Sequence, residues 1–503
     1  MGCQRNGFKK ENFILSVDVG TTSIRCHVYD KEAKIQGACT TKVVPLYPEV
    51  GYVEMDPDAI WKGFVTVVKG AVQDAGVQMR QIDALGISTQ RGTFTTWDRR
   101  TGVPFHNFIS WQDRRAANLV KSWNSSCTMK AIKGVMKMLY CVTRQKRMLA
   151  ASLITFSTQH VTFRLVWALT NYKQVRQAVA EGNCCFGTID TWLLFKLTKG
   201  EVHATDYSNA SSTGIFDSYQ VWCKCIDIFS KFWCEFFFVI SMADQQAAVF
   251  GECCFDVGDV KITMGTGTFM DINTGSKPHT SAAGLYPLVG WKIGSEVVYL
   301  AEGNSADTGT AIKWAQELEL FSDVRDTSSM ACSVSDSDGV CFVPSFSGLQ
   351  VPLNDPKACA SLMGLKPSTT KSHLVRAILE SVAFSKVSCS VIECAVFLPF
   401  CLRMDGGVSS NDFVMQLTAD LLGRKVARPQ NCEMSCLGAA FIAGLGVGFW
   451  KTKEELKKLQ STDEAFLPKG TSKSGAHSPS QEYIPVLQSW ERAIQRSMNW
   501  YKP

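Results

Sequence analysis

Two short glycine-threonine segments, each following an apolar run, most constrain what this chain can fold into. They are residues 18–23 (DVGTTS) and 264–269 (MGTGTF), and the runs before them, 13–17 and 260–263, are predicted to be buried strands. Small residues after a strand let the backbone bend sharply, so that amide N–H groups and hydroxyls can face an anion. One such turn is weak evidence, because Gly and Thr are ordinary hairpin residues. Two of them, one in each half, indicate a duplicated domain that grips a polyphosphate from both sides.

Composition allows two large domains and argues against several classes of protein. The 503 residues can form two full hydrophobic cores, and a content of 46% hydrophobic and 19% charged residues is typical of a soluble globular chain. The net charge of +6 is small for this length, and no Lys/Arg block resembles a nucleic-acid-binding arm. We therefore expect no nucleic-acid partner and attribute the excess charge to local anion binding and solvated surface.

Cysteine usage and hydropathy favour a soluble protein in a reducing compartment. The twenty cysteines show neither zinc-site spacing nor a small disulfide scaffold, which favours reduced thiols and a cytoplasmic location. No segment supplies the roughly 18 uncharged apolar residues that a membrane span requires, so no transmembrane segment is expected. The start Met1-Gly2-Cys3 hints at acylation, but Asn6 stands where the myristoylation pattern requires Ser or Thr.

The first half alternates strands and helices, which indicates an α/β fold with a mixed or parallel sheet. Residues 12–30 are predicted to be a β-hairpin, residues 60–72 have helical periodicity, and residues 82–88 form a strand that leads into Thr89-Gln90-Arg91. In such sheets ligands bind at strand ends, where Asp18 and Arg91 would lie.

The second half repeats this alternation, and the domain boundary is expected near residues 252–258. A helix is predicted after Asp244, a strand before Gly265, and a helix over 374–383 that Ser372 could cap. The remaining predicted elements are a helix around 310–318, a DGG turn at 405–407 before a helix opened by Asn411, a small-residue helix over 437–446, a loop over 470–481 and a closing helix around 485–500.

Two aspartates could perform the chemistry of phosphoryl transfer, which needs a metal partner and a group that orients the attacking hydroxyl. Asp18 could hold Mg²⁺ through water, or it could only form a turn with its own backbone. Asp244 could accept the hydroxyl proton, or it could only cap the following helix. These two functions of Asp244 are compatible, because a helix N-terminus keeps a carboxylate ionised.

Arg91 and Trp111 could recognise a small polyol. An aromatic wall covers the apolar face of a polyol while an Arg donates to its hydroxyls. The alternative is that the segment 111–115 (WQDRR) only forms surface ion pairs, which no spacing rule excludes.

Taken together, the ordered blocks resemble the glycerol kinases of the FGGY carbohydrate kinase family. The resemblance covers nearly the whole chain and is closest to a divergent animal branch. The blocks are 13–25, 51–57 (GYVEMDP), 86–91 (GISTQR), 111–115 (WQDRR), 187–192 (GTIDTW), 205–211 (TDYSNAS), 243–251, 264–268, 379–381 (LES), 405–407 (DGG), 437–440 (LGAA) and 448–450 (GFW).

The resemblance implies an α/β fold of two actin/hexokinase-like (ribonuclease H-like) domains with an interdomain catalytic cleft. The expected domains are 12–252, with the polyol site and first phosphate turn, 258–450, with the nucleotide site, and a helical tail over 451–503. It also implies ATP-dependent phosphorylation of glycerol to sn-glycerol 3-phosphate, with ATP and Mg²⁺ as cofactors. A homodimer stays one candidate assembly, because the sequence does not determine the oligomeric state.

The resemblance also assigns roles to individual residues. Asp244 matches the catalytic base, Gln245, Arg91 and Trp111 match the polyol site, and Asp18 lies near the metal. The matched nucleotide-binding positions are Thr21, Thr22, Ser23, Arg25, Thr266, Gly309, Gly407 and Asn411.

The departures from the family leave other functions open. Gly92 stands where glycerol kinases have Glu, and losing a charged acceptor costs about 1.5–3 kcal/mol of substrate binding. The family's substrate tyrosine falls within 152–164 and is not placed, and segments 230–241 and 388–402 look unlike the family. Gly92 favours a kinase for another polyol or ketose, and the altered segments favour a nucleotide-binding scaffold. A third class, an actin- or chaperone-like ATPase, is disfavoured by Arg91 and Trp111.

Overall fold

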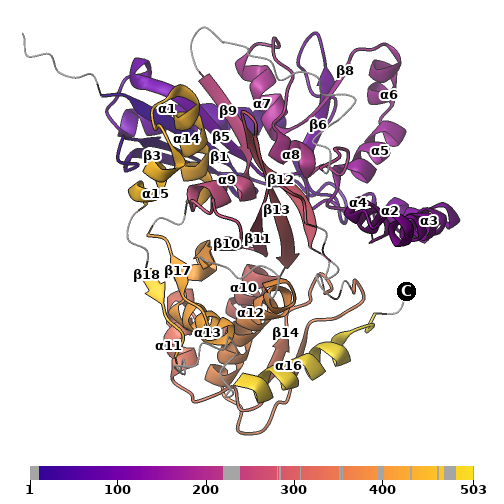
Figure 1. Cartoon of the computed structure of the whole chain (residues 1–503), viewed down its shortest axis with the longest axis vertical. Helices are drawn as coiled ribbons and strands as arrows, with labels where there is room; N and C mark the ends of the chain where they lie inside the picture. Colours follow the sequence, from indigo (N-terminus) through magenta and orange to yellow (C-terminus); the bar gives the residue numbers. More distant parts are fainter. Residues whose placement is uncertain are drawn as a thin grey trace, which may run out of the picture. The chain divides into compact units, whose positions relative to one another are not determined.

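The computed structural model forms two compact units that interleave along the chain (Figure 1). The first unit comprises Met1–Cys253, Leu288–Val298 and Met434–Gln460, and the second comprises Cys254–Pro287, Tyr299–Glu433 and Ser461–Pro503. The residues that the structure describes are 11–153, 155–218, 238–279, 281, 285–305, 307–349, 353, 355–394, 402–430, 433–460, 464–469 and 483–501.

A five-stranded sheet forms the centre of the first unit, in the order β3-β2-β1-β5-β9. Its strands are β1 (Phe13–Val19), β2 (Ser23–Tyr29), β3 (Ile35–Lys42), β5 (Ile82–Thr89) and β9 (Phe238–Ala243). The β1–β2 and β2–β3 pairs are antiparallel, whereas β1–β5 and β5–β9 are parallel. The hairpin predicted over residues 12–30 is confirmed, as is the strand that ends just before Gln90.

Helix α1 (Pro57–Asp74) packs on one face of this sheet for reasons visible in its sequence. Asp56 caps it by accepting from the Asp58 amide, and Pro57 stands at the first helical position, where no N–H is needed. Apolar side chains recur at helical spacing, so that Ile60 and Phe64 are buried with β1 and with α7 (Ile189–Leu197) in one core.

On the other side, α14 (Met434–Val447) packs closely against β5 and against α9 (Asp244–Gly251). Glycine makes this approach feasible, because a Cβ at Gly438 would lie 1.7 Å from the Ala247 carbonyl oxygen and one at Gly86 would lie 2.1 Å from the Ala439 carbonyl oxygen. The small-residue helix predicted over 437–446 is thus confirmed. It belongs to the first unit, although it follows most of the second unit in sequence.

A second, four-stranded sheet and a group of helices complete the first unit. The sheet has the order β4-β7-β6-β8 and contains β4 (Glu54–Met55), β7 (Phe108–Ile109), β6 (Phe94–Asp98) and β8 (Cys184–Thr188). The remaining elements are η1 (Met79–Gln81), α2 (Ala117–Ser125), α3 (Cys127–Thr143), α4 (Lys146–Leu153), α5 (Val161–Asn171), α6 (Lys173–Ala180), α8 (Tyr207–Ser211) and α15 (Lys453–Leu459).

A seven-stranded sheet in the order β12-β13-β11-β10-β16-β17-β18 forms the centre of the second unit, except that most of its edge strand β12 and the start of β13 fall within Leu288–Val298 of the first unit. Its strands are β10 (Val260–Met264), β11 (Thr268–Gly275), β12 (Tyr286–Ile293), β13 (Glu296–Ser305), β16 (Leu402–Asp405), β17 (Val426–Arg428) and β18 (Glu464–Phe466). The other elements are β14 (Cys341–Val343), β15 (Ser361–Met363), α10 (Thr308–Glu317), η2 (Val324–Asp326), α11 (Thr327–Cys332), α12 (Lys371–Cys394), η3 (Gly407–Ser410), α13 (Asp412–Leu422) and α16 (Ile484–Ser497).

Element boundaries differ from the sequence predictions in two places. Helix α12 begins at Lys371, so Ser372 is a helical residue and not its cap. Helix α9 begins at Asp244 itself, and Ala243 occupies the capping position. Parts of the unusual segments, 230–237 and 395–401, and all of the predicted loop over 470–481 lie outside the described residues, as do Gly2 and Cys3.

Among the described residues, none of the helices combines the length and the hydropathy needed to cross a membrane.

Candidate active site

Three parallel strands of the first unit end side by side, and polar residues follow each end. The register aligns Asp18 of β1 with Ser88 of β5, and Ser88 with Met242 of β9. Arg91 and Asp244 therefore emerge from the same edge of the sheet as Asp18. The carboxyl ends of parallel strands are where α/β folds bind ligands.

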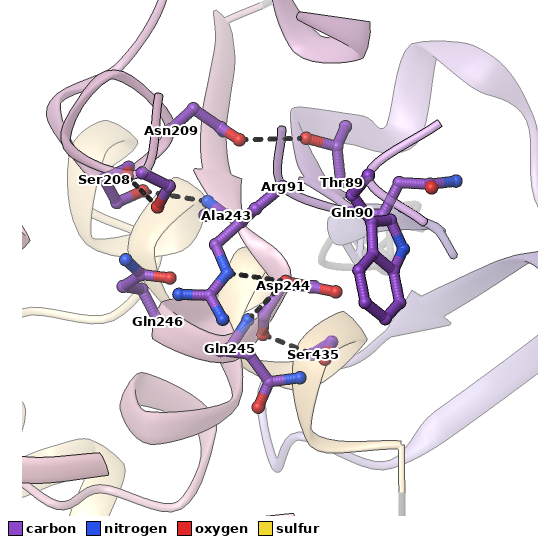
Figure 2. A network of polar contacts seen from close by, with 12 residues as sticks. Thr89, Gln90, Arg91, Ser208, Asn209, Ala243, Asp244, Gln245, Gln246 and Ser435 are labelled. Atoms are coloured by element: carbon purple, nitrogen blue, oxygen red, sulfur yellow. Dashed lines mark hydrogen bonds and ion pairs between the residues drawn. The ribbon is translucent and has the colours of Figure 1, made fainter. Parts of the chain in front are cut away.

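Asp244 and Arg91 form the charged centre of this edge. Figure 2 shows the Arg91 guanidinium turned toward the Asp244 carboxylate, with Nε 3.6 Å from Oδ1. The same Oδ1 accepts from the Gln245 amide at 2.8 Å, and Ser435 Oγ donates to the Asp244 carbonyl oxygen at 3.0 Å. Both the helix N-terminus and the Arg favour an ionised carboxylate. With 24% of its side chain exposed, Asp244 can accept a proton from a bound molecule.

Trp111 is fixed next to the first glycine-threonine turn. Its indole Nε1 donates to Thr21 Oγ1 at 3.0 Å, and its backbone N–H donates to Thr93 Oγ1 at 3.1 Å. Thr93 in turn donates to Gln90 Oε1 at 2.9 Å, and Gln90 Nε2 donates to the Gly20 carbonyl at 2.9 Å. The indole N–H of Trp111 is therefore already engaged by Thr21, and the side chain is half-buried.

Asp18 is buried at the base of the same turn. Ser88 Oγ donates to Asp18 Oδ1 at 2.7 Å, and Arg25 Nη1 lies 3.5 Å from Oδ2. Thr22 is exposed at the tip of the turn, and Ser23 is buried, with its carbonyl accepting from the Gly20 amide at 3.0 Å. The hydroxyl of Thr22 and the guanidinium of Arg25 are thus placed to meet an anion.

The donor set fits a magnesium ion that is held mainly by a bound phosphate and water. Mg²⁺ keeps several waters and usually takes only one or two protein carboxylates, so Asp18 alone suffices as the protein side of such a site. Across the described residues, His, Cys, Asp and Glu side chains do not gather in threes at a site that could hold a metal by itself.

Arg164 contacts both the segment that carries Arg91 and the segment that carries Trp111, and it is completely buried. Its guanidinium donates to the Gly92 carbonyl at 2.8 Å and to the Ser110 carbonyl at 2.6 Å, the residues next to Arg91 and Trp111. Further donations reach the carbonyls of Thr158, Gln159 and Ile109. One side chain therefore joins the two segments that present Arg91 and Trp111.

The geometry at Gly92 explains its identity. Its φ is +68°, a conformation that favours glycine, and a Cβ there would lie 3.3 Å from the Gln159 carbonyl oxygen and 3.4 Å from Arg164 Nη2. A glutamate at this position would be strained on this backbone. On this backbone, Gly92 therefore could not be exchanged for glutamate without local rearrangement.

Arg115, which the sequence places in the same polar block, has a structural role. It is buried, and its Nη2 lies 2.8 Å from Asp113 Oδ2 and 2.7 Å from Glu54 Oε1. The guanidinium also stands over the Tyr52 ring at 4.2 Å. The ion-pair interpretation of the 111–115 block therefore holds for Arg115, except that the pair is buried.

A network from α8 fixes the residue before Asp244. The Ala243 amide donates to Ser208 Oγ at 2.8 Å, and Ser208 donates to Asp206, which caps α8 (Figure 2 shows Ser208 and Ala243). Asn209 Nδ2 donates to Asp206 Oδ1 at 2.7 Å, and Asn209 Oδ1 accepts from Thr89 Oγ1 at 3.4 Å. Burial, with Asp190 nearby, raises the pKa of Asp206 to about 6.

In the second unit, the turn at residues 264–268 meets the start of α10. The Gly309 amide donates to the Thr266 carbonyl at 2.8 Å, and Thr268 and Thr308 share a hydrogen bond of 2.7 Å. A Cβ at Gly309 would lie 2.5 Å from the Gly265 carbonyl oxygen, so only glycine allows this contact. Thr266 is exposed at the tip.

The other two nucleotide candidates lie beyond β16 and differ in what they offer. Gly407 is exposed, and a Cβ there would meet nothing within 4 Å, so a ligand could approach its backbone. Asn411 caps α13 by accepting from the Val414 amide at 3.1 Å, and its Nδ2 donates to Thr327 Oγ1 at 2.9 Å. Its amide therefore already has partners, and its role toward a nucleotide stays a prediction.

Comparison with known proteins places the chain in a family. The N-terminal domain of the FGGY family of carbohydrate kinases matches residues 13–226, and its C-terminal domain matches residues 260–447. The chain belongs to the FGGY family of carbohydrate kinases.

Relatives of this FGGY kinase carry a consistent name. Glycerol kinase 5 of Danio rerio is 67% identical over 100% of this chain and 99% of that protein, and glycerol kinase 5 of Homo sapiens is 55% identical over 97% and 96%. The crystal structure of Plasmodium falciparum glycerol kinase with ADP superimposes with a TM-score of 0.82 at 28% identity, over 97% of this chain and 98% of that one. The α/β fold predicted from the sequence is thus confirmed.

Sequence reasoning missed two kinds of residue in this FGGY kinase. Arg164 gave no signal, because its partners are backbone carbonyls, and it stands in a segment that matches the family poorly. Ser208 and Asp206 lie in a block that does match (TDYSNAS), but an ordinary Ser and Asp suggested no role. Their position before Asp244 emerges only from the fold.

Proposed function

We propose that this FGGY kinase transfers the γ-phosphoryl group of ATP to a terminal hydroxyl of glycerol, giving sn-glycerol 3-phosphate and ADP. The observation that carries the proposal is the Arg91–Asp244 pair at the strand ends of the first unit, with Trp111 fixed beside the adjoining turn. The names of its relatives and the P. falciparum glycerol kinase structure support the choice of substrates.

In this proposal the first unit binds and orients glycerol. The Trp111 ring covers the carbon chain, while Arg91 and Gln245 donate to hydroxyls. Asp244 accepts the proton of the attacking hydroxyl, the oxygen bonds to the γ-phosphorus, and the bond to the β–γ bridging oxygen of ATP breaks. An ionised Asp is a weak base, but a loose transition state needs little early proton removal.

The glycine-threonine turns supply the phosphate contacts. Thr21, Thr22, Ser23 and Arg25 are the candidates in the first unit, and Thr266, Gly309, Gly407 and Asn411 are those in the second. When bound, Mg²⁺ neutralises charge on the transferring phosphoryl group, and Asp18 is the residue that would hold it. The cysteine pattern favours reduced thiols, so we propose the cytoplasm as the compartment.

Gly92 supports one competing function, a kinase for another small polyol or ketose. The carboxylate that glycerol kinases use is missing there, and the positive φ disfavours its restoration. A substrate with fewer or differently placed hydroxyls would lose less from this absence.

A substrate panel distinguishes the two functions. The purified full chain is given ATP and Mg²⁺ with glycerol, dihydroxyacetone, erythritol, ribulose, xylulose or gluconate, and products are identified by ³¹P NMR. We expect the highest kcat/KM with glycerol. A higher kcat/KM with a ketose, and little or no glycerol 3-phosphate, would overturn the substrate assignment. ATP binding without polyol-stimulated hydrolysis would instead indicate a regulatory scaffold.

A further inference from the structure

One stretch of the chain is strongly basic and contains no acid. Residues 114–180 contain twelve Lys and Arg and no Asp or Glu, whereas the whole chain has 46 acidic residues and a net charge of only +6. Helices α2, α3 and α4 lie within this stretch. Figure 1 shows them side by side at the edge of the first unit, away from its central sheet. The part of the chain that forms these three helices, residues 117–153, holds seven of the twelve cations and no acid.

Helix α3 presents an apolar stripe to solvent, the reverse of an ordinary surface helix. Met129 points inward and is 2% exposed. On the outward side Val135 is 48%, Met138 61% and Val142 79% exposed, and these residues recur at intervals of three and four, along one face. We call these three residues the α3 stripe. Ile132, one turn before Val135 on the same helix, is 40% exposed.

Cations border the α3 stripe and lack acidic partners. Lys130, Lys137 and Arg144 are exposed, and none of them forms an ion pair with any carboxylate among the described residues. Arg147 in α4 differs, because it pairs with Asp217 at 2.6 Å. An apolar stripe bordered by unpaired cations is complementary to a partner with an apolar interior and an anionic surface.

We propose that the α3 stripe and its cations form a docking surface for an anionic phospholipid bilayer. Val135, Met138 and Val142 enter the boundary between headgroups and acyl chains, while Lys130 and Lys137 extend their ammonium groups to lipid phosphates and carboxylates. This makes the kinase a peripheral membrane protein whose attachment depends on lipid charge.

Charge and shape argue against other occupants. A second copy would bring two basic faces together, and like charges repel. A nucleic acid would pair with the cations but would leave the α3 stripe in water. An acidic groove on another protein would have to surround α3. The inner side of α3 is already packed on the first unit, so only its outer side can contact a partner. A bilayer is flat and meets that limit.

The direct experiment is flotation of the purified full chain with vesicles. One set is made of phosphatidylcholine alone, and the other contains about one-third phosphatidylserine. We expect the protein to float with the anionic vesicles only, and to be released as salt rises from about 0.1 M to about 0.5 M, because screening weakens exposed charges.

Variants locate the surface. Lys130→Gln with Lys137→Gln should lower the partition coefficient about 25-fold, since each cation near the surface contributes a factor of about five. The matched control is Lys62→Gln with Lys69→Gln, two exposed cations seven residues apart on α1, which should leave the partition coefficient unchanged. Met138→Ser should lower it about threefold to tenfold, with Val179→Ser on α6 as its control.

The outcomes separate the alternatives. Solution activity and the unfolding midpoint should be the same in all variants, because every position is exposed. The proposal is overturned by absence of flotation with anionic vesicles at low salt, or by binding that the α1 control weakens as much as the α3 variant does. A concentration-dependent dimer that Met138→Ser dissociates would also overturn it, because the α3 stripe would then be a protein interface.

Discussion

Replacing Arg164 is the perturbation that most sharply tests how the candidate site is held together. Its guanidinium donates to five backbone carbonyls and is completely buried. Two of those carbonyls belong to Gly92 and Ser110, which adjoin Arg91 and Trp111. Arg164→Met removes all five hydrogen bonds while keeping much of the side-chain volume, whereas Arg164→Lys keeps a cation with at most three donors.

The expected cost follows from the contacts. Hydrogen bonds from a charged donor contribute about 1.5–3 kcal/mol each, so five of them sum to about 10 kcal/mol. Removing the buried cation also removes a desolvation penalty of several kcal/mol. We therefore expect Arg164→Met to lower the free energy of unfolding by about 4 kcal/mol, and Arg164→Lys to lose about half of that.

Kinetics test the positioning role separately from stability. The segments that Arg164 joins present Arg91 and Trp111, so their displacement should raise the KM for glycerol at least tenfold in Arg164→Met, with partial recovery in Arg164→Lys. The KM for ATP should rise much less than the KM for glycerol, since the turns of the second unit make no hydrogen bond to Arg164 and the turn of the first unit is linked to it only through Trp111 and Thr21. The assay is initial-rate kinetics below the unfolding transition, and Arg176→Met, at an exposed position in α6, is the control.

Two results would refute this reasoning. One is an Arg164→Met protein whose free energy of unfolding lies within about 1 kcal/mol of the parent, which would mean that the five hydrogen bonds are easily replaced. The other is an equal rise in both KM values, which would indicate a general loss of structure and no specific effect on the proposed polyol site.

Three further predictions concern packing, the second turn and pH. Gly438→Ala should lower the free energy of unfolding, measured by urea titration, by about 3 kcal/mol or more, because the new Cβ would collide with the Ala247 carbonyl. The control is Gly134→Ala in α3, where the Cβ meets nothing within 4 Å and should stabilise the chain slightly. Equal effects of the two substitutions would contradict the packing argument. Gly309→Ala would place a Cβ 2.5 Å from the Gly265 carbonyl oxygen and so displace the second turn. In steady-state assays it should raise the KM for ATP about tenfold or more and leave the KM for glycerol unchanged. An unchanged KM for ATP would show that this turn does not take part in nucleotide binding. Because the pKa of Asp206 is raised to about 6 in the folded state, the folded state binds more protons than the unfolded state between about pH 4 and 6, and this group's contribution to stability is lost as pH rises through that window. Asp206→Asn should therefore flatten the dependence of the free energy of unfolding on pH in this window. An unchanged pH dependence, measured by denaturation at several pH values, would contradict the assignment.

Local sequence signals were sufficient for the elements that surround the site. The Gly-Thr turn after β1 was recognisable because an apolar run ended in small residues, and the hairpin it predicts is present. The strand before Gln90 was recognisable as an apolar run with a polar end, and the helix that follows Ala243 was recognisable from Asp244, a residue type common at helix N-termini. That Asp18 and Arg91 follow neighbouring strand ends was expected from the rule that ligands bind there, and the register of β1 and β5 confirms it. That β9 brings Asp244 to the same edge emerged only from the structure.

Long-range contacts were not predictable in the same way. The cap of α9 was misjudged by one residue, because Asp is a common capping residue and only the backbone shows Ala243 in that position. The attachment of α14 to the first unit depends on the fit of Gly438 against Ala247, which no pattern in either segment reveals. Arg164 reads in sequence as an ordinary basic residue of an amphipathic helix.

The central claim is that Asp244 accepts the proton of the attacking hydroxyl, and Asp244→Asn tests it most directly. Its kcat is measured by single-turnover transfer from labelled ATP, and binding of glycerol and ATP is measured by calorimetry, with Asp58→Asn in the first turn of α1 as the matched control. We predict that Asp244→Asn loses about 10²–10⁴-fold in kcat while both ligands bind within a few-fold of the parent. A kcat within tenfold of the parent would contradict the account.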